Sequence, residues 1–214
     1  MREVLTVVLA SHNEGKLAEL RALLAELPVR LVSVVEALGA PLAVSEDGQT
    51  FEDNAVLKAR AVCRETGLMA LADDSGLEVD ALGGRPGVRS ARFAHERATD
   101  AENNAALLRE LEDHAAPRSA RFRCVLALVT PWSDVPRFAS GVCEGEIARA
   151  ARGSGGFGYD PLFVVEGHGG RAMAELDDAE KNAVSHRGRA VRALLPLLVD
   201  VINERLDEAE RSAG

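Results

Sequence analysis

The feature that most constrains the fold of this chain is a pair of adjacent carboxylates, Asp73 and Asp74, which closely follows an apolar run over residues 68–71. Ser75 and Gly76 follow the pair, and apolar residues then resume. Two neighbouring like charges disfavour a regular strand, so we expect a turn here. If the turn opens on a cleft, the pair suits a hard cation and a polarised water. An Asx-type turn between two strands explains the same residues without any function.

A strand, a turn and a helix are predicted at the start of the chain. The apolar run over residues 4–10 is typical of a buried strand, and apolar residues at helical spacing predict a helix over residues 14–27. The sequence SHNEGK joins them, and the free amide groups of a helix N-terminus form a natural phosphate site. Asn13 can cap the helix, Gly15 lets a ligand approach the backbone, and Lys16 adds positive charge. Simple helix capping is the alternative explanation.

The rest of the chain alternates between predicted strands and helices. Strands are expected over residues 29–35, 120–130, 137–149 and 162–165, with a turn at 131–136, and helices over 51–67, 101–113, a short segment after Asp177 and a long segment after Ser185. The segment 37–50 is loop-like. Pro196 should kink or break the last helix, and residues 207–214 are predicted to be a disordered tail.

Charge and cysteine content exclude several classes of function. A net charge of −9 argues against a binder of nucleic-acid polymers, because that role needs a basic face. The three cysteines show no metal-ligand spacing, which is typical of a reduced, cytoplasmic protein without disulfides. The N-terminal apolar run is too short for a signal peptide, and no segment reaches transmembrane length, so no membrane partner is expected.

Three further features indicate a ligand with phosphates and a planar base. Lys16, Lys58 and Lys181 are the three lysines among 25 basic residues, and a lysine ammonium is a compact charge suited to phosphate oxygens. A glycine-rich loop frames Phe157 and Tyr159, as expected of a loop that lies against a planar ligand. His186 and Arg187 stand in the first turn of a predicted helix, where cations oppose the helix dipole; this costly placement hints at function.

Five segments, in this order and spacing, resemble one known family: SHNEGK, EDGQTFEDNAVLKA, ADDSGLEVDALGGRPGVRSAR, GGFGYDPLF and AEKNAVSHRGRA. The family is that of the Ham1-like noncanonical purine nucleoside triphosphate pyrophosphatases, also called inosine triphosphate pyrophosphatases. The resemblance covers about residues 4 to 205. It implies a single domain over residues 1–206, with an elongated α/β fold in which helices flank a mixed central sheet and two lobes surround a substrate cleft. It also implies a homodimer and Mg²⁺-dependent hydrolysis of dITP, ITP and XTP to the monophosphate and pyrophosphate, which removes deaminated purines from the nucleotide pool.

The resemblance also assigns residues to roles. It implies that Asp74 is the general base and a Mg²⁺ ligand, with Asp73 beside it, and that Glu46 is the second metal carboxylate, although Asp47 or Glu52 can claim that role. The residues implied to bind the triphosphate are Ser11, His12, Asn13, Glu14, Gly15, Lys16 and Lys58, with Ser75 also touching substrate. Those implied to surround the base are Phe157, Gly158, Tyr159, Asp160, Lys181, His186 and Arg187. His12 stands where some relatives carry glycine, which leaves its role open.

Cationic donors from Lys181, His186 and Arg187 fit this substrate class. Hypoxanthine and xanthine carry an acceptor at the six position, whereas adenine carries an amino donor there, and a buried mismatch of that kind can cost several kcal/mol. How the 2-amino group of guanine is rejected does not follow from the sequence. Two alternatives stay open: a Maf-type nucleotide pyrophosphatase with another base preference, and a nucleotide sensor that binds without turnover.

Overall fold

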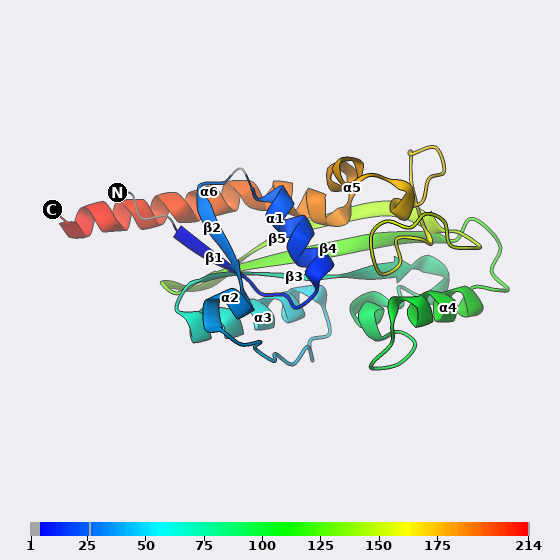
Figure 1. The fold of residues 1–214 in the computed structure, drawn as a ribbon, viewed down its shortest axis with the longest axis horizontal. Coiled ribbons are helices and arrows are strands. Elements are labelled where there is room, and N and C mark those ends of the chain that lie inside the picture. The colour runs from blue at the N-terminus through cyan, green and yellow to red at the C-terminus, as the bar shows by residue number, and fades with distance from the viewer. Residues whose placement is uncertain (1–4, 26, 214) are drawn as a thin grey trace.

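The computed structural model describes residues 5–25 and 27–213, with side chains up to residue 205. The molecule is elongated, and one end carries both β1 (Leu5–Leu9) and the far end of the C-terminal helix α6 (His186–Ala213) (Figure 1). Helix α4 (Asp100–Glu110) lies towards the opposite end. None of the helices among the described residues combines the length and apolarity that a bilayer span requires.

A six-stranded mixed sheet runs through the molecule in the order β2-β1-β3-β4-β5-β6. The remaining strands are β2 (Val29–Ser33), β3 (Met69–Val79), β4 (Ser119–Thr130), β5 (Ser133–Ile147) and β6 (Phe163–Val165). Strand β1 pairs in parallel with β2 and β3, whereas the pairs β3–β4, β4–β5 and β5–β6 are antiparallel. The predicted mixed α/β architecture with flanking helices is therefore confirmed.

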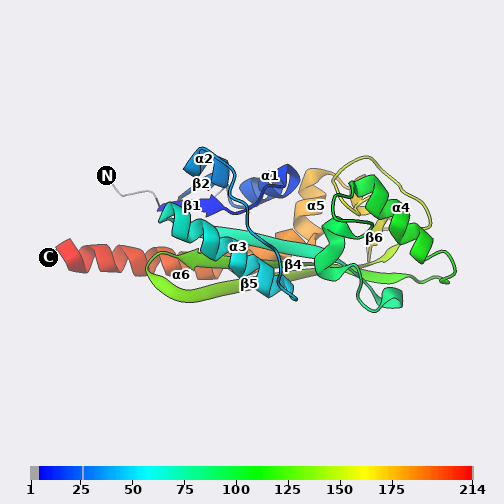
Figure 2. The same ribbon diagram turned by 90° about the horizontal axis from the view of Figure 1, so that it is seen from below.

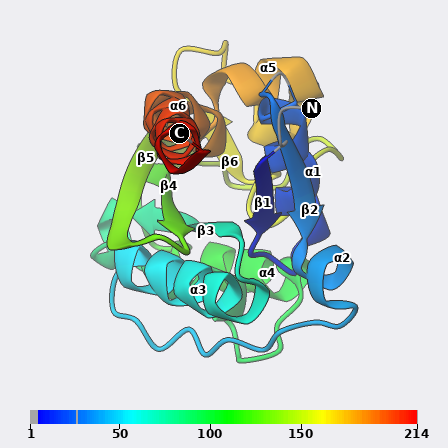
Figure 3. The ribbon, with the colours of Figure 1, turned by 90° about the vertical axis from the view of Figure 1, so that its left-hand side faces the viewer.

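Helices cover both faces of the sheet (Figures 2 and 3). One face packs against α1 (Glu14–Leu23) and α6, and the other against α3 (Phe51–Thr66). Two short helices, α2 (Val34–Leu38) and α5 (Asp178–Val184), complete the set. A third apolar cluster, which includes Leu77, Leu107 and Phe163, fills the end of the molecule near α4. The long strands β3 and β4 run from the first two clusters into the third, so the segment Asp73–Gly76 lies between them.

Three helices begin at a capping side chain. Thr50, Thr99 and Asp177 cap α3, α4 and α5, and each accepts a hydrogen bond from the backbone of the third helical residue. Helix α3 ends at Thr66, one residue before its expected end, and Gly67 follows it in the left-handed conformation that glycine commonly adopts there.

Several predicted boundaries were wrong. Strand β2 ends at Ser33, because Ser33 and Glu36 form a capping box that starts α2 where the strand was expected to continue. Strand β5 begins at Ser133, inside the turn expected at residues 131–136. Helix α4 ends at Glu110, three residues before the predicted end. Pro196 does not break α6, which runs on to Ala213 through most of the segment expected to be a disordered tail. The domain boundary at residue 206 stays a prediction.

Candidate functional site

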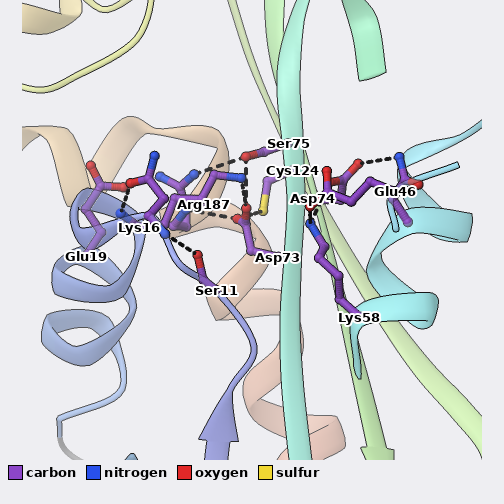
Figure 4. Close-up of polar contacts among 12 residues, drawn as sticks. Ser11, Lys16, Glu19, Glu46, Lys58, Asp73, Asp74, Ser75, Cys124 and Arg187 are labelled. Atoms are coloured by element: carbon purple, nitrogen blue, oxygen red, sulfur yellow. Dashed lines mark hydrogen bonds and ion pairs between the residues drawn. The ribbon is translucent and has the colours of Figure 1, made fainter. Parts of the chain in front are cut away.

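The two central carboxylates lie in the middle of a strand and not in a turn, so the expected turn at this pair was wrong. Strand β3 continues from Met69 to Val79, and Asp73 and Asp74 pair with Leu126 and Val125 of β4. Because successive side chains of a strand point to opposite faces, Asp73 faces α1 and α6 whereas Asp74 faces α3 (Figure 4). Like-charge repulsion is relieved because each carboxylate has its own cations.

Asp73 is a fully engaged anion. Its side chain forms an ion pair with Lys16, accepts a hydrogen bond from Arg187 Nε at 2.9 Å, and is contacted by the Ser75 hydroxyl at 3.0 Å and the Cys124 thiol at 3.1 Å. Burial alone raises a carboxyl pKa, but Arg187 and Lys16 hold the pKa of Asp73 well below its usual range. Asp73 therefore stays charged and anchors cations.

The pKa of Asp74 is shifted in the opposite direction from that of Asp73. Its Oδ1 atom lies 2.7 Å from Lys58 Nζ, and its Oδ2 atom lies 3.4 Å from Asn54 Nδ2. Asn54 and Lys58 are one helical turn apart on α3. Burial raises the pKa of Asp74 despite the opposing charge of Lys58. A carboxylate with a raised pKa accepts a proton more readily, so the geometry separates the neighbouring acids into an anchor and a candidate base.

Glu46 and Asp74 meet at one ammonium group. Lys58 Nζ lies 3.3 Å from Glu46 Oε1 as well as 2.7 Å from Asp74. Arg92 donates to the backbone oxygen of Glu46 at 3.2 Å, and Asn54 accepts from Gly48 at 2.8 Å, so the loop that carries Glu46 is tied on both sides. The expected rivals of Glu46 lie elsewhere: Asp47 accepts from Ser45, and Glu52 pairs with Arg123.

The carboxylates of Glu46 and Asp74 fit Mg²⁺. This ion takes hard oxygen ligands and in nucleotide sites commonly binds to one or two carboxylates together with phosphate oxygens and water. Within the described part of the chain, there is no cluster of three or more acidic, histidine or cysteine side chains that could hold a metal. A pair of carboxylates that relies on substrate for further ligands matches that donor set.

The SHNEGK turn joins β1 to α1 beside these acids. Asn13 caps α1 by accepting from the Lys16 amide at 3.0 Å, as predicted. A hollow near the turn is lined by Ser11, His12, Asn13, Lys16, Glu46, Lys58, Arg92, Asp73, Asp74 and Ser75, among others. The His12 ring contacts the Leu42 carbonyl oxygen at 2.8 Å, so this side chain links the SHNEGK turn to the loop that contains Leu42. The space that Gly15 leaves is taken by the Phe157 ring, not by open room for a ligand.

A second hollow adjoins the first and shares Asn13, Lys16 and Ser75 with it. Its walls include Asp100, Asn103, Phe122, Phe157, Gly158, Tyr159, Asp160, Lys181, His186 and Arg187. The glycine-rich loop is held from several sides: the Gly158 amide donates to Asp100 at 2.7 Å, and Asn104 donates to the Gly158 carbonyl at 2.9 Å. Tyr159 is buried, and its hydroxyl donates to the Ser90 carbonyl at 2.9 Å.

His186 is not the cationic donor that the sequence predicted. It is buried and stacks on Phe122 with ring centroids 4.7 Å apart. Burial and the neighbouring Arg187 place its pKa well below the usual value, so the ring is neutral. Its Nδ1 atom is buried without a hydrogen-bond partner among the described residues.

Lys181 and Arg187 are held by acids. Lys181 Nζ contacts Asp160 and Glu19 at 2.7 Å each, and Arg187 contacts Asp73, Ser75 and Glu19.

Sequence reasoning missed Glu19, and it did not assign Asn54 or Arg92 to the site. A signal for Glu19 was present: it lies three residues after Lys16 on α1, and side chains three residues apart share one face of a helix. The remaining predicted binding residue, Glu14, begins α1 at the edge of the turn.

Several known proteins are similar to this chain over most of its length. The family model described as "Ham1 family" matches residues 7–197. A protein named dITP/XTP pyrophosphatase from Desulforamulus reducens is 51% identical, over 90% of this chain and 94% of its own length. The protein of that name from Coxiella burnetii is 48% identical over 92% of this chain and 98% of its own length. A HAM1 protein structure from Coxiella burnetii aligns with a TM-score of 0.83 at 48% identity, covering 92% of this chain and 100% of that one. The Staphylococcus aureus Ham1 protein aligns with a TM-score of 0.80 at 36% identity, over 91% and 98% of the two chains.

Proposed function

The chain belongs to the Ham1 family, and from this premise we propose that it hydrolyses dITP, ITP and XTP to the nucleoside monophosphate and pyrophosphate. The observation that carries the proposal is the division of the central carboxylates over two faces of β3. One is a permanent anion that anchors cations, and the other has a raised pKa and stands beside Glu46 and Lys58.

In the proposed reaction, a water molecule attacks the α-phosphorus and Asp74 accepts its proton. The new bond joins the water oxygen to the α-phosphorus, and the bond from the α-phosphorus to the bridging oxygen of the β-phosphate breaks, so that pyrophosphate leaves. Lys16 and Lys58, with the amide groups at the start of α1, bind the phosphates. Glu46 and Asp74 would hold Mg²⁺, which supplies neutralisation of phosphate charge.

We assign base selection to Lys181 and Arg187. A neutral imidazole can donate or accept depending on its tautomer, so His186 alone does not distinguish a six-position oxygen from an amino group. Lysine and arginine only donate. Both cations lie over the face of Phe157, at 4.8 and 5.6 Å from the ring centroid, where the base pocket begins. Donors in this position favour keto purines over adenine.

A product assay that distinguishes pyrophosphate from orthophosphate, run on a panel of nucleotides, tests the proposal. With Mg²⁺ present, dITP and XTP should yield pyrophosphate and the monophosphate at a much higher kcat/KM than dATP, dTTP or dUTP. A preference for dTTP or dUTP supports the Maf-type alternative, and binding without turnover supports a sensor. Release of orthophosphate from dITP contradicts attack at the α-phosphorus.

A homodimer and a cytoplasmic location belong to the same proposal. The chain has a mass of 22.8 kDa, so light scattering on the purified protein should give about twice that value. A mass equal to one chain across micromolar concentrations contradicts the dimer.

A further inference from the structure

Six charged side chains of alternating sign connect the first hollow, beside the SHNEGK turn, to the second hollow, beside the glycine-rich loop. In order, they are Lys16, Asp73, Arg187, Glu19, Lys181 and Asp160. Figure 4 shows the first four of them, drawn from α1, β3 and α6. The three positive and three negative charges balance. The proposed function assigns roles to Lys16, Asp73, Arg187 and Lys181. Asp160 lines the second hollow, whereas Glu19 has no role in the proposal and lines neither hollow.

Glu19 joins parts of the chain that are far apart in the sequence. It lies on α1, the helix that starts at the phosphate-binding turn, and its carboxylate contacts Lys181 of α5 at 2.7 Å and Arg187 of α6. Its side chain is 14% exposed, and it lines neither of the two hollows. Glu19 therefore acts on a ligand only through Lys181 and Arg187.

The two partners of Glu19 depend on it for their orientation. Arg187 is held at Nε by Asp73, at Nη2 by Ser75 and at Nη1 by Glu19, so its planar group is fixed on three sides. Lys181 has Asp160 and Glu19 as its acid partners. Without Glu19, Lys181 keeps a single acid partner on a flexible four-carbon side chain, and one end of Arg187 loses its acceptor.

We infer that Glu19 is a positioning residue that holds Lys181 and Arg187 in the orientation that selects keto purines. This inference rests on the proposed function and concerns the same site. Since a bound base meets the donors of Lys181 and Arg187, loss of Glu19 harms the substrates that use those donors more than it harms adenine nucleotides. Base selectivity, and not only activity, is then the property that Glu19 controls.

The test compares wild-type protein with Glu19→Gln, which keeps the size of the side chain and removes its charge. We expect kcat/KM for dITP to fall about 10-fold or more and kcat/KM for dATP to change less than about threefold, so that their ratio shrinks. Arg21→Gln on the exposed side of α1 is the matched control and should leave the ratio unchanged. Equal losses for both nucleotides, or an unchanged ratio, overturn the inference.

A double-mutant cycle separates positioning from general destabilisation. If Glu19 acts through Lys181, then Glu19→Gln combined with Lys181→Gln loses less activity than the product of the two single losses. Multiplicative losses contradict the inference. If Glu19→Gln does not fold, the dITP-to-dATP ratio in Glu19→Asp decides, because this variant keeps the charge but shortens its reach. An unchanged ratio there overturns the inference. A wild-type protein that releases no pyrophosphate from dITP refutes the proposed function itself, which is a different result.

Discussion

At the scale of single residues, the two adjacent acids differ because a strand sends them to opposite faces. Asp73 meets Arg187 and Lys16 in a fully buried site, and Asp74 meets Lys58 in a site that opens towards Glu46. The same residue type, one position apart, therefore has a lowered pKa on one face and a raised pKa on the other. Neighbouring acids with separated pKa values are a common source of distinct roles in an active site.

Substitution by asparagine should separate the two roles. Asp74→Asn removes the proton acceptor, so we expect kcat to fall roughly 10²- to 10⁴-fold with little change in the free energy of unfolding. Asp73→Asn leaves Arg187 and Lys16 without a buried counter-charge and should cost about 3–5 kcal/mol of stability. Steady-state kinetics and urea denaturation of both variants measure this contrast. Near-normal turnover of Asp74→Asn refutes its role as the base.

His186 should make stability depend on pH. Its pKa is lowered in the folded state by burial and by Arg187, so the unfolded chain binds the proton more readily. The free energy of unfolding is unaffected by this residue above pH 6.5 and falls by roughly 1.4 kcal/mol per pH unit below it. His186→Gln should remove this loss between pH 6.5 and 5, as measured by urea denaturation at several pH values. The exposed His114→Gln is the control, and parallel pH curves for His186→Gln and wild type contradict the prediction.

At the scale of elements, the site depends on how closely helix α6 approaches the sheet. Gly141 on β5 has no side chain, and a Cβ atom there would collide with the His186 carbonyl oxygen and the Ala190 amide nitrogen. This contact sets the height of the first turn of α6 above the sheet, and that turn carries His186 and Arg187. A glycine outside both hollows therefore controls the position of the Arg187 guanidinium.

Gly141→Ala should lower activity from outside the pocket. The collision is with backbone atoms, so α6 must shift, at a cost of about 1–3 kcal/mol in stability. A displacement of Arg187 should reduce kcat/KM for dITP by about 10- to 100-fold. The neighbouring Ser140→Ala on the exposed side is the control. Kinetics and thermal melting of both variants measure the effect, and a fully active Gly141→Ala protein contradicts it.

Local signals predicted elements well and contacts between distant elements poorly. The helix over residues 51–66 was predictable because Thr50 and Gly67 mark its ends within the sequence itself. The strand through Asp73 and Asp74 was not, because the cations that stabilise it come from α1, α3 and α6. Glu19 was missed for the same reason, since its partners lie more than 160 residues away in sequence. The candidate binding residues come from motif resemblance and stay a prediction, whereas the neutral state of His186 follows only from its burial.

At the scale of the whole molecule, an acidic protein provides a local site for an anion. The net charge is −9, yet the hollow beside the acids is lined by Lys16, Lys58 and Arg92. Each of these cations is already tied to an acid or a carbonyl oxygen of the protein. The long-range field disfavours nucleic-acid polymers, which need an extended basic face, while a small triphosphate needs only the local cations and its own Mg²⁺.

Removal of Mg²⁺ should therefore abolish turnover without unfolding the protein. Lys58 already neutralises charge on Glu46 and Asp74, and three apolar clusters hold the fold on both sides of the site, so folding does not require a metal. We expect EDTA to stop pyrophosphate release from dITP and to change Tm by less than about 2 °C, in contrast to small domains whose folding energy comes from a bound ion. Differential scanning calorimetry and the release assay, each repeated after Mg²⁺ is restored, measure the two effects. A large drop in Tm on chelation shows that the carboxylate pair needs the ion for the fold itself, and full turnover in EDTA shows that Glu46 and Asp74 do not work through a metal.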